Sequence, residues 1–182
     1  MEARERVSRM LAYWLRHRPD AAGLELSEDG WAELARVIEA LAREGVTASE
    51  AELHAVLGAP GKQRFELDER GLCIRAREGH TVAVRIERPT PPPPERLYHG
   101  TVSRSLPSIR RQGLTPRGRT HVHLSERIEE AVAVARRRGE PVILEVRARE
   151  LAVHGVRLER SSSGVWLAER VPPELVSVLR TE

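Results

Sequence analysis

The 182-residue sequence predicts an α+β protein built as two lobes. Five prolines fall within residues 88–94, and such a run adopts an extended polyproline II conformation that acts as a stiff spacer. In the second half of the chain, too few helices separate the strands for a doubly wound parallel sheet. We therefore expect a first lobe at residues 1–88, a proline-rich linker at 89–96 and a second lobe at 97–182.

The first lobe begins with an amphipathic helix. Apolar residues recur between Val7 and Leu15 at the spacing of one buried helix face, and Pro19 disfavours helical geometry at Arg18 and ends the helix there. The order of elements that follows is typical of a winged helix, a module that binds nucleic acid or serves as a protein-interaction domain. These elements are a strand at 24–26, a helix at 31–43, a helix at 47–57 that starts at a capping box, and a hairpin of strands 64–67 and 72–76.

The second lobe mixes strands and helices. Gly113 closes one short helix, and Ser125 is the expected N-cap of the next. No GxGxxG or GxxxxGKS run occurs in the sequence, so it offers neither a Rossmann nor a P-loop site. We expect helices at 105–112 and 126–138, and strands at 96–99, 121–124, 141–146, 156–158, 165–167 and 176–179.

Composition excludes several classes of protein. Charged residues make up 31% and hydrophobic residues 40%, which is typical of a soluble globular chain. No apolar run approaches the roughly 20 residues that a membrane-spanning helix needs, and the charged N-terminus lacks the apolar segment of a secretory signal. The single cysteine, Cys73, excludes an intramolecular disulfide and a cysteine-rich zinc site. We therefore expect a cytoplasmic protein.

Charge is distributed unevenly along the chain. Residues 1–90 carry 14 cationic and 16 acidic side chains, a net charge of −2, whereas residues 91–182 carry 16 and 11, a net charge of +5. All of the cations except Lys62 are arginines. Arginine suits bidentate recognition of phosphate, but GC-rich or thermophilic genomes also favour it.

Arginine and histidine stand where short loops meet the predicted helices and strands. Arg16, His17 and Arg18 end the first helix, where cations also simply complement the helix dipole. Arg64 enters a strand from a Gly/Pro loop, and the alternation along that strand places Phe65 on the opposite, core-facing side. These residues offer an anion-binding site in the first lobe.

Three histidines of the second lobe, His99, His121 and His123, are the only group that suggests a metal. No Asp, Glu or Cys accompanies them at ligand spacing, so we expect no metal. The sequence also lacks a Ser-His-Asp order, a paired-carboxylate motif and HExxH. The arginines, histidines and accessible glycines that remain suit an anionic substrate and a reaction that depends on charge stabilisation.

Seven segments, in family order, resemble the RNA (tRNA) 2′-phosphotransferases, NAD-dependent enzymes related to ADP-ribosyltransferases. The resemblance implies a winged-helix RNA-binding lobe followed by an ADP-ribosyltransferase-like NAD-binding lobe. The segments are LRHRP at 15–19, DGW at 29–31, KQRF at 62–65, RAREGHT at 75–81, YHGT at 98–101, GRTHVHLS at 118–125 and GVWL at 164–167.

The resemblance also implies the reaction. An internal RNA 2′-monophosphate attacks the anomeric carbon of the nicotinamide ribose of NAD, and nicotinamide leaves. The ribose 2″-hydroxyl of the resulting 2′-phospho-ADP-ribosyl RNA then attacks the phosphate, which releases 2′-OH RNA and ADP-ribose 1″,2″-cyclic phosphate. The substrate would be a tRNA-like RNA, and we expect a monomer without an obligate protein partner.

Site residues follow from the same resemblance. The catalytic Arg-His-Arg-Arg set falls on Arg16, His17, Arg64 and Arg119. The NAD signature falls on His99, His123 and Val165, an apolar residue where many ADP-ribosyltransferases have glutamate. The expected NAD surroundings also include Gly100, Thr101, Ser103, Gly113 and Ser125. The expected RNA-binding residues are Arg16, Arg18, Lys62 and Arg64.

Two other functions remain open at the level of sequence. One is an ADP-ribosyltransferase that modifies nucleic-acid phosphate ends and stops after the first step. Detection of the cyclic phosphate would separate it from a phosphotransferase. The other is a non-catalytic RNA-binding winged-helix protein, which would show no dependence on NAD.

Overall fold

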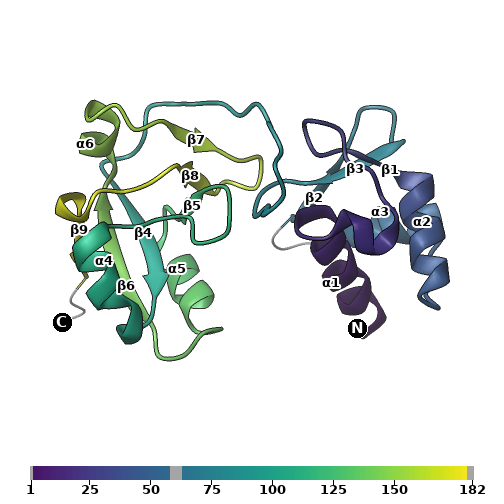
Figure 1. The fold of residues 1–182 in the computed structure, drawn as a ribbon, viewed down its shortest axis with the longest axis horizontal. Coiled ribbons are helices and arrows are strands. Elements are labelled where there is room, and N and C mark those ends of the chain that lie inside the picture. The colour runs from purple at the N-terminus through teal and green to yellow at the C-terminus, as the bar shows by residue number, and fades with distance from the viewer. Residues whose placement is uncertain (1, 58–62, 180–182) are drawn as a thin grey trace. The chain divides into compact units, whose positions relative to one another are not determined.

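A computed structural model describes residues 2–57 and 63–179 of the chain (Figure 1). In this part of the chain it holds six α-helices and three small antiparallel sheets. The chain divides into two compact units, Met1–Glu87 and Arg88–Glu182. Within the described residues, no helix has the length and apolar character needed to cross a membrane.

The first unit is a helical cluster with one three-stranded sheet. Its sheet has the order β1-β3-β2, and β2 and β3 form the predicted hairpin, with Phe65 opposite Ala76. The carboxylate of Asp68 closes the turn by accepting hydrogen bonds from the backbone N–H groups of Leu72 and Cys73. The elements are α1 (Glu2–Arg16), η1 (Pro19–Ala22), β1 (Ala32–Glu33), α2 (Leu34–Arg43), α3 (Glu50–Leu57), β2 (Phe65–Leu67) and β3 (Cys73–Ala76).

The core of this unit confirms the predicted buried face of the first helix. Leu11 and Leu15 of α1 are fully buried, as are Leu41 of α2, Leu53 of α3 and Ile74 of β3. These side chains join all three helices and the sheet in one apolar cluster. Burial of this kind contributes about 25 cal/mol per Å² of apolar surface. Because α1 and β3 share this core, it holds the end of α1 in place relative to the hairpin.

Three local predictions for the first unit are wrong. The helix expected at 31–43 begins at Leu34, because Ala32 and Glu33 pair with β3 as strand β1. Residues 24–26 form no strand, because the backbone N–H of Leu24 closes the turn after η1 by bonding to the carbonyl of Pro19 (2.9 Å). The capping box of α3 starts at Ser49 rather than Thr47: the Ser49 N–H donates to the Glu52 carboxylate (2.8 Å), and the Glu52 N–H donates to Ser49 Oγ (3.2 Å). The box is therefore reciprocal, as such caps are.

The second unit holds two three-stranded antiparallel sheets, with the orders β4-β6-β9 and β5-β8-β7. Helix α5 packs against β4 and β6, and α6 contacts β4 (Figure 1). Its elements are β4 (Arg96–Thr101), η2 (Ser103–Ser105), α4 (Leu106–Gln112), β5 (Val122–Leu124), α5 (Ile128–Ala135), β6 (Val142–Arg147), α6 (Ala148–Val153), β7 (Leu158–Arg160), β8 (Trp166–Ala168), η3 (Pro173–Leu175) and β9 (Val176–Val178).

The proline-rich segment lies against the second unit. The carbonyl of Pro89 accepts a hydrogen bond from the backbone N–H of Arg160 (2.9 Å), and Glu95 O accepts one from Ala148 N (3.0 Å). Arg88 pairs with Glu159 of β7 at 3.3 Å, with both side chains largely buried. Residues 88–95 connect the two units, and contacts at both ends of this segment hold it to the second unit.

Candidate functional site

Arg16 and His17 stand at the C-terminal end of α1. The helix ends because the N–H groups of both His17 and Arg18 turn back to the carbonyl of Tyr13 (3.0 Å each), and Pro19 follows. The carbonyl of Arg16, one of the last unpaired groups of the helix, accepts hydrogen bonds from the backbone of Thr81 (2.8 Å) and Val82 (3.3 Å). The loop after β3 therefore caps α1 beside His17.

The guanidinium of Arg16 packs into the hairpin region. Its Nη2 donates to the main-chain carbonyl of Arg64 (3.5 Å), and its Cζ lies 5.9 Å from the ring centre of Phe65. Gly79, at φ +87°, lies against it, and a Cβ at Gly79 would come within 3.5 Å of Arg16 Cζ. Such a contact is of ordinary van der Waals length, so it is the positive φ at this position that favours glycine.

Arg64 is held against the same helix. Its Nη1 donates to Ser8 Oγ of α1 (3.2 Å), and its carbonyl accepts the N–H of Arg77 (3.0 Å). Phe65 is buried, as the alternation along the strand predicts. Three of the predicted catalytic residues therefore lie on or against α1: Arg16 and His17 at its end, and Arg64 through contacts with Ser8 and Arg16.

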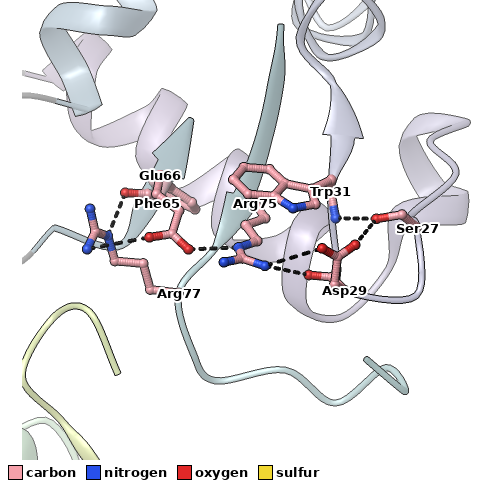
Figure 2. A network of polar contacts seen from close by, with 7 residues as sticks. All are labelled: Ser27, Asp29, Trp31, Phe65, Glu66, Arg75 and Arg77. Carbon is pink, nitrogen blue, oxygen red and sulfur yellow. Dashed lines mark hydrogen bonds and ion pairs between the residues drawn. The ribbon is translucent and has the colours of Figure 1, made fainter. Parts of the chain in front are cut away.

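A network of ion pairs supports the strand that follows Arg64 (Figure 2). Arg75 lies over the Trp31 ring, with its Cζ 4.3 Å from the ring centre, and its Nε pairs with Glu66 at 2.7 Å. Arg77 approaches the same carboxylate at 3.6 Å and donates from Nε to the carbonyl of Phe65 (3.0 Å). Arg75 also reaches Asp29. The network fixes the main chain on both sides of Phe65.

Sequence reasoning did not single out Glu66, Arg75 or Arg77. The available signal was their position: Arg75 and Arg77 belong to the RAREGHT segment, and Asp29 and Trp31 form the DGW segment. Several residues of the segments that resemble the family therefore support the candidate site through ion pairs and packing.

Arg18 forms an exposed ion pair with an acidic residue close by in the sequence. It forms a fork with the carboxylate of Asp20, with contacts of 2.8–3.2 Å, and both side chains are exposed. The hydrogen bonds from Arg18 hold the pKa of the Asp20 carboxyl below its usual value. Lys62, the other cation expected to bind RNA, lies outside the described residues.

In the second unit, the structure brings His99, His123 and Arg119 together. Strand β4 meets the end of β5 through a pair of 2.8 Å hydrogen bonds between the backbones of Tyr98 and Ser125. His99 Nδ1 donates to the carbonyl of His123 (2.9 Å), because a carbonyl can only accept. Arg119 Nη1 lies 3.4 Å from His123 Nδ1, which accepts.

The imidazole of His99 is partly buried and lies near arginine side chains. Burial lowers the pKa of its imidazole most, and the charges of Arg138, Arg119 and Arg117 lower it further, against the opposing effect of the bond to His123. Neutral His99 thus has its proton on Nδ1 and an acceptor on Nε2. Three arginines around a neutral histidine make this part of the unit suitable for an anionic ligand.

Gly100 and Gly113 have a packing role. A Cβ at Gly100 would lie 1.9 Å from the carbonyl oxygen of Ala131 in α5, and one at Gly113 would lie 1.9 Å from that of Val171. Gly113 also adopts φ +72°, a conformation that L side chains rarely take. Contact of either glycine with NAD stays a prediction.

The other predicted NAD residues are spread over several elements. Thr101 is buried at the end of β4, Ser103 is exposed in η2, and Ser125 follows β5. Val165 is held in a turn, where its N–H donates to Ser161 Oγ (3.1 Å) and its carbonyl accepts from Ser161 N (2.8 Å), just before β8 pairs with β5. No three His, Cys, Asp or Glu side chains of the described part of the chain gather at a spacing that could hold a metal ion.

Comparison with known proteins supports the resemblance. The family model described as "RNA 2'-phosphotransferase, Tpt1 / KptA family" matches residues 2–170. A probable RNA 2'-phosphotransferase of Burkholderia lata is 47% identical over 172 residues, 94% of this chain and 89% of the relative. Those of Acaryochloris marina and Pseudomonas aeruginosa are 43% and 46% identical over 92% and 93% of this chain, and over 93% and 94% of their own lengths. The chain belongs to the RNA 2′-phosphotransferase family.

Proposed function

We propose that this protein is an NAD-dependent RNA 2′-phosphotransferase, which removes an internal 2′-phosphate from RNA and transfers it to the ADP-ribosyl group of NAD. Membership of the RNA 2′-phosphotransferase family supports the transfer of a phosphate at an RNA 2′ position. The observation that carries the proposal is the placement of Arg16, His17 and Arg64 against α1. Arg16 and His17 stand at the end of the helix, and Arg64 bonds to Ser8 through its guanidinium and to Arg16 through its carbonyl.

The proposal assigns a different task to each unit. The order of helices and hairpin in the first unit supports a winged helix that binds RNA. The second unit would be the ADP-ribosyltransferase-like part that binds NAD. Its donor set fits a dinucleotide: Arg117, Arg119 and Arg138 supply positive charge for a pyrophosphate, and His99 and His123 supply ring nitrogens and flat faces for ribose and nicotinamide.

In the first step, the RNA 2′-phosphate is the nucleophile. A phosphate monoester is already anionic at neutral pH, so no general base is needed. A bond forms between a phosphate oxygen and the anomeric carbon of the nicotinamide ribose, and the bond from that carbon to the nicotinamide nitrogen breaks. An apolar residue at 165, where related enzymes place glutamate, is compatible with a nucleophile that needs no activation.

The second step needs both acid–base and electrostatic assistance. The ribose 2″-hydroxyl gives up its proton to His17 as its oxygen attacks phosphorus, and the bond from phosphorus to the RNA 2′-oxygen breaks. That oxygen takes up a proton and becomes the 2′-hydroxyl. Arg16 and Arg64 stabilise the negative charge that gathers on the phosphate oxygens, because guanidinium groups bind such oxygens bidentately.

One incubation tests the proposal. An oligonucleotide with a single internal 2′-phosphate is incubated with the protein, with and without NAD, and the products are identified by mass spectrometry. We expect 2′-OH RNA, ADP-ribose 1″,2″-cyclic phosphate and nicotinamide only when NAD is present. An oligonucleotide with a terminal phosphate is the matched control: a stable ADP-ribosylated end without cyclic phosphate would favour the end-modifying transferase. RNA binding without any NAD-dependent product would favour a non-catalytic protein.

A further inference from the structure

Thr81 contacts both His17 and the carbonyl of Arg16 at the end of α1. The reaction steps proposed above do not involve this threonine. It lies in the loop that follows β3. Its backbone N–H donates to the carbonyl of Arg16 (2.8 Å), and its Oγ1 lies 3.3 Å from that same carbonyl oxygen and 3.1 Å from His17 Nδ1. The hydroxyl therefore stands between one fixed acceptor and one ring nitrogen whose role depends on its proton.

The single hydrogen of the Thr81 hydroxyl decides whether His17 Nδ1 donates or accepts. A carbonyl oxygen can only accept, so the contact with Arg16 uses the single hydrogen of the Thr81 hydroxyl. The hydroxyl then presents lone pairs to His17 Nδ1, and a hydrogen bond between them requires that Nδ1 carry the proton. In a neutral imidazole with a proton on Nδ1, the other nitrogen, Nε2, is the base.

We propose that Thr81 is a positioning residue that holds neutral His17 as the Nδ1–H tautomer and so makes Nε2 the nitrogen that accepts the proton in the second step. This inference rests on the proposed function for its consequence, but the tautomer itself does not depend on it. A histidine in the opposite tautomer carries its proton on Nε2, which then has no free lone pair, and its basic nitrogen is Nδ1 instead.

The variant Thr81→Val tests the proposal with little change of shape. Valine keeps the backbone N–H that bonds to Arg16 and loses only the hydroxyl. We expect the second step to slow roughly 10- to 100-fold, the size of effect known for hydrogen-bond partners that orient metal-bound imidazoles, while the first step is unchanged. The 2′-phospho-ADP-ribosyl RNA should then accumulate. Thr81→Ser should restore the second step, and Thr115→Val, at an exposed threonine of the second unit, should have no effect.

Nuclear magnetic resonance reads the tautomer without turnover. Two-bond ¹⁵N–¹H spectra of the full-length protein labelled at histidine show which ring nitrogen carries the proton, and His17→Gln identifies the His17 signals among those of seven histidines. We expect Nδ1–H in the wild-type protein and in Thr81→Ser, and a shift toward Nε2–H in Thr81→Val. An Nε2–H tautomer in the wild type, or an unchanged tautomer in Thr81→Val, would overturn the proposal even if the protein proves to be a phosphotransferase. Conversely, the expected tautomers in a protein without NAD-dependent turnover would support the positioning role while the proposed function fails.

Discussion

Ser8 Oγ accepts a hydrogen bond from Nη1 of Arg64 over 3.2 Å, which joins two residues 56 positions apart in the sequence. Helix α1 therefore holds Arg64 twice, at its side chain through Ser8 and at its main-chain carbonyl through Arg16. An arginine whose side chain is already fixed loses less conformational freedom if it binds a phosphate.

Removal of this contact should weaken the second step modestly. Ser8→Ala takes away one hydrogen bond to a guanidinium without removing a charge, so we expect a loss of about 1 kcal/mol, or roughly a fivefold lower rate of cyclic phosphate formation. Single-turnover assays with the isolated 2′-phospho-ADP-ribosyl RNA measure this rate directly. Ser177→Ala, at an exposed serine of β9, is the matched control. Equal rates for the two variants would show that Ser8 does not position Arg64.

Substitutions of the predicted catalytic residues should separate the two steps. Negative charge concentrates on the phosphate in the second step, whereas the first uses a nucleophile that is already ionised. We therefore expect Arg16→Ala, His17→Ala and Arg64→Ala to slow the second step by roughly 10²–10³-fold, the usual cost of losing one such contact. The 2′-phospho-ADP-ribosyl RNA should accumulate on a gel.

Arg119 provides the contrasting case. It lies beside His123, and its charge contributes to the environment of His99. Because the ADP-ribosyl group takes part in both steps of the proposed reaction, Arg119→Ala should impair both. If the three first-unit variants instead leave the starting RNA unreacted, with no trapped intermediate, those residues act in substrate binding or in the first step.

The fork between Arg18 and Asp20 predicts how RNA affinity responds to charge. Asp20 neutralises the cation that the sequence assigns to RNA, so Asp20→Asn should tighten RNA binding at low salt. Arg18→Ala should make the slope of log K against log salt shallower by about one. Fluorescence anisotropy over a range of salt concentrations measures both. Glu39→Gln, which breaks the exposed pair with Arg36 on α2, is the matched control. If Asp20→Asn and Glu39→Gln behave alike, Arg18 does not contact the RNA.

The sequence predicts most of the local structure around the candidate site. The periodicity from Val7 to Leu15 and the position of Pro19 place Arg16 and His17 at a helix end, and the hairpin with its closing Asp68 follows from the alternation of residues 64–76. These features depend on neighbours in sequence, which is why patterns reveal them.

Contacts between distant segments could not be derived in this way. The bond from Arg64 to Ser8, the stacking of Arg75 on Trp31 and the link from Thr81 to His17 each need the tertiary fold to be known. Helix α6 was also missed, because Ala148–Val153 is only six residues long and directly follows a strand. Its burial of Ala148 and Leu151 is too short a pattern to indicate a helix.

Gly100 should be intolerant of any side chain. A Cβ there would lie 1.9 Å from the carbonyl oxygen of Ala131, so Gly100→Ala forces α5 away from β4. We expect the free energy of unfolding to fall by about 3 kcal/mol, the upper end of the usual cost of overpacking, measured by urea titration. Gly118→Ala is the control, because its Cβ would meet nothing within 4 Å. Its only cost is the backbone strain of an alanine at a φ of +84°. A smaller loss for Gly100→Ala than for Gly118→Ala would contradict the packing role.

The partly buried imidazole of His99, which lies near three arginines, should make the stability of the second unit depend on pH. Burial, then the charges of Arg138, Arg119 and Arg117, lower the pKa of His99 from the ordinary value of 6.5. The unfolded chain therefore binds a proton at His99 more readily than the folded chain does, so protonation favours unfolding. This contribution to stability is fully present above pH 6.5 and is lost as the pH falls below that value toward the lowered pKa of the folded state. The pKa of His121 is also lowered, mainly by burial, so its protonation also favours unfolding.

We expect the free energy of unfolding, from urea titrations at several pH values between 8 and 5.5, to decrease on acidification. His99→Gln should reduce this decrease, whatever its effect on stability at pH 8, whereas the exposed control His154→Gln should not. Parallel pH profiles for the wild type and His99→Gln would show that His99 takes up its proton equally well in the folded and unfolded chain.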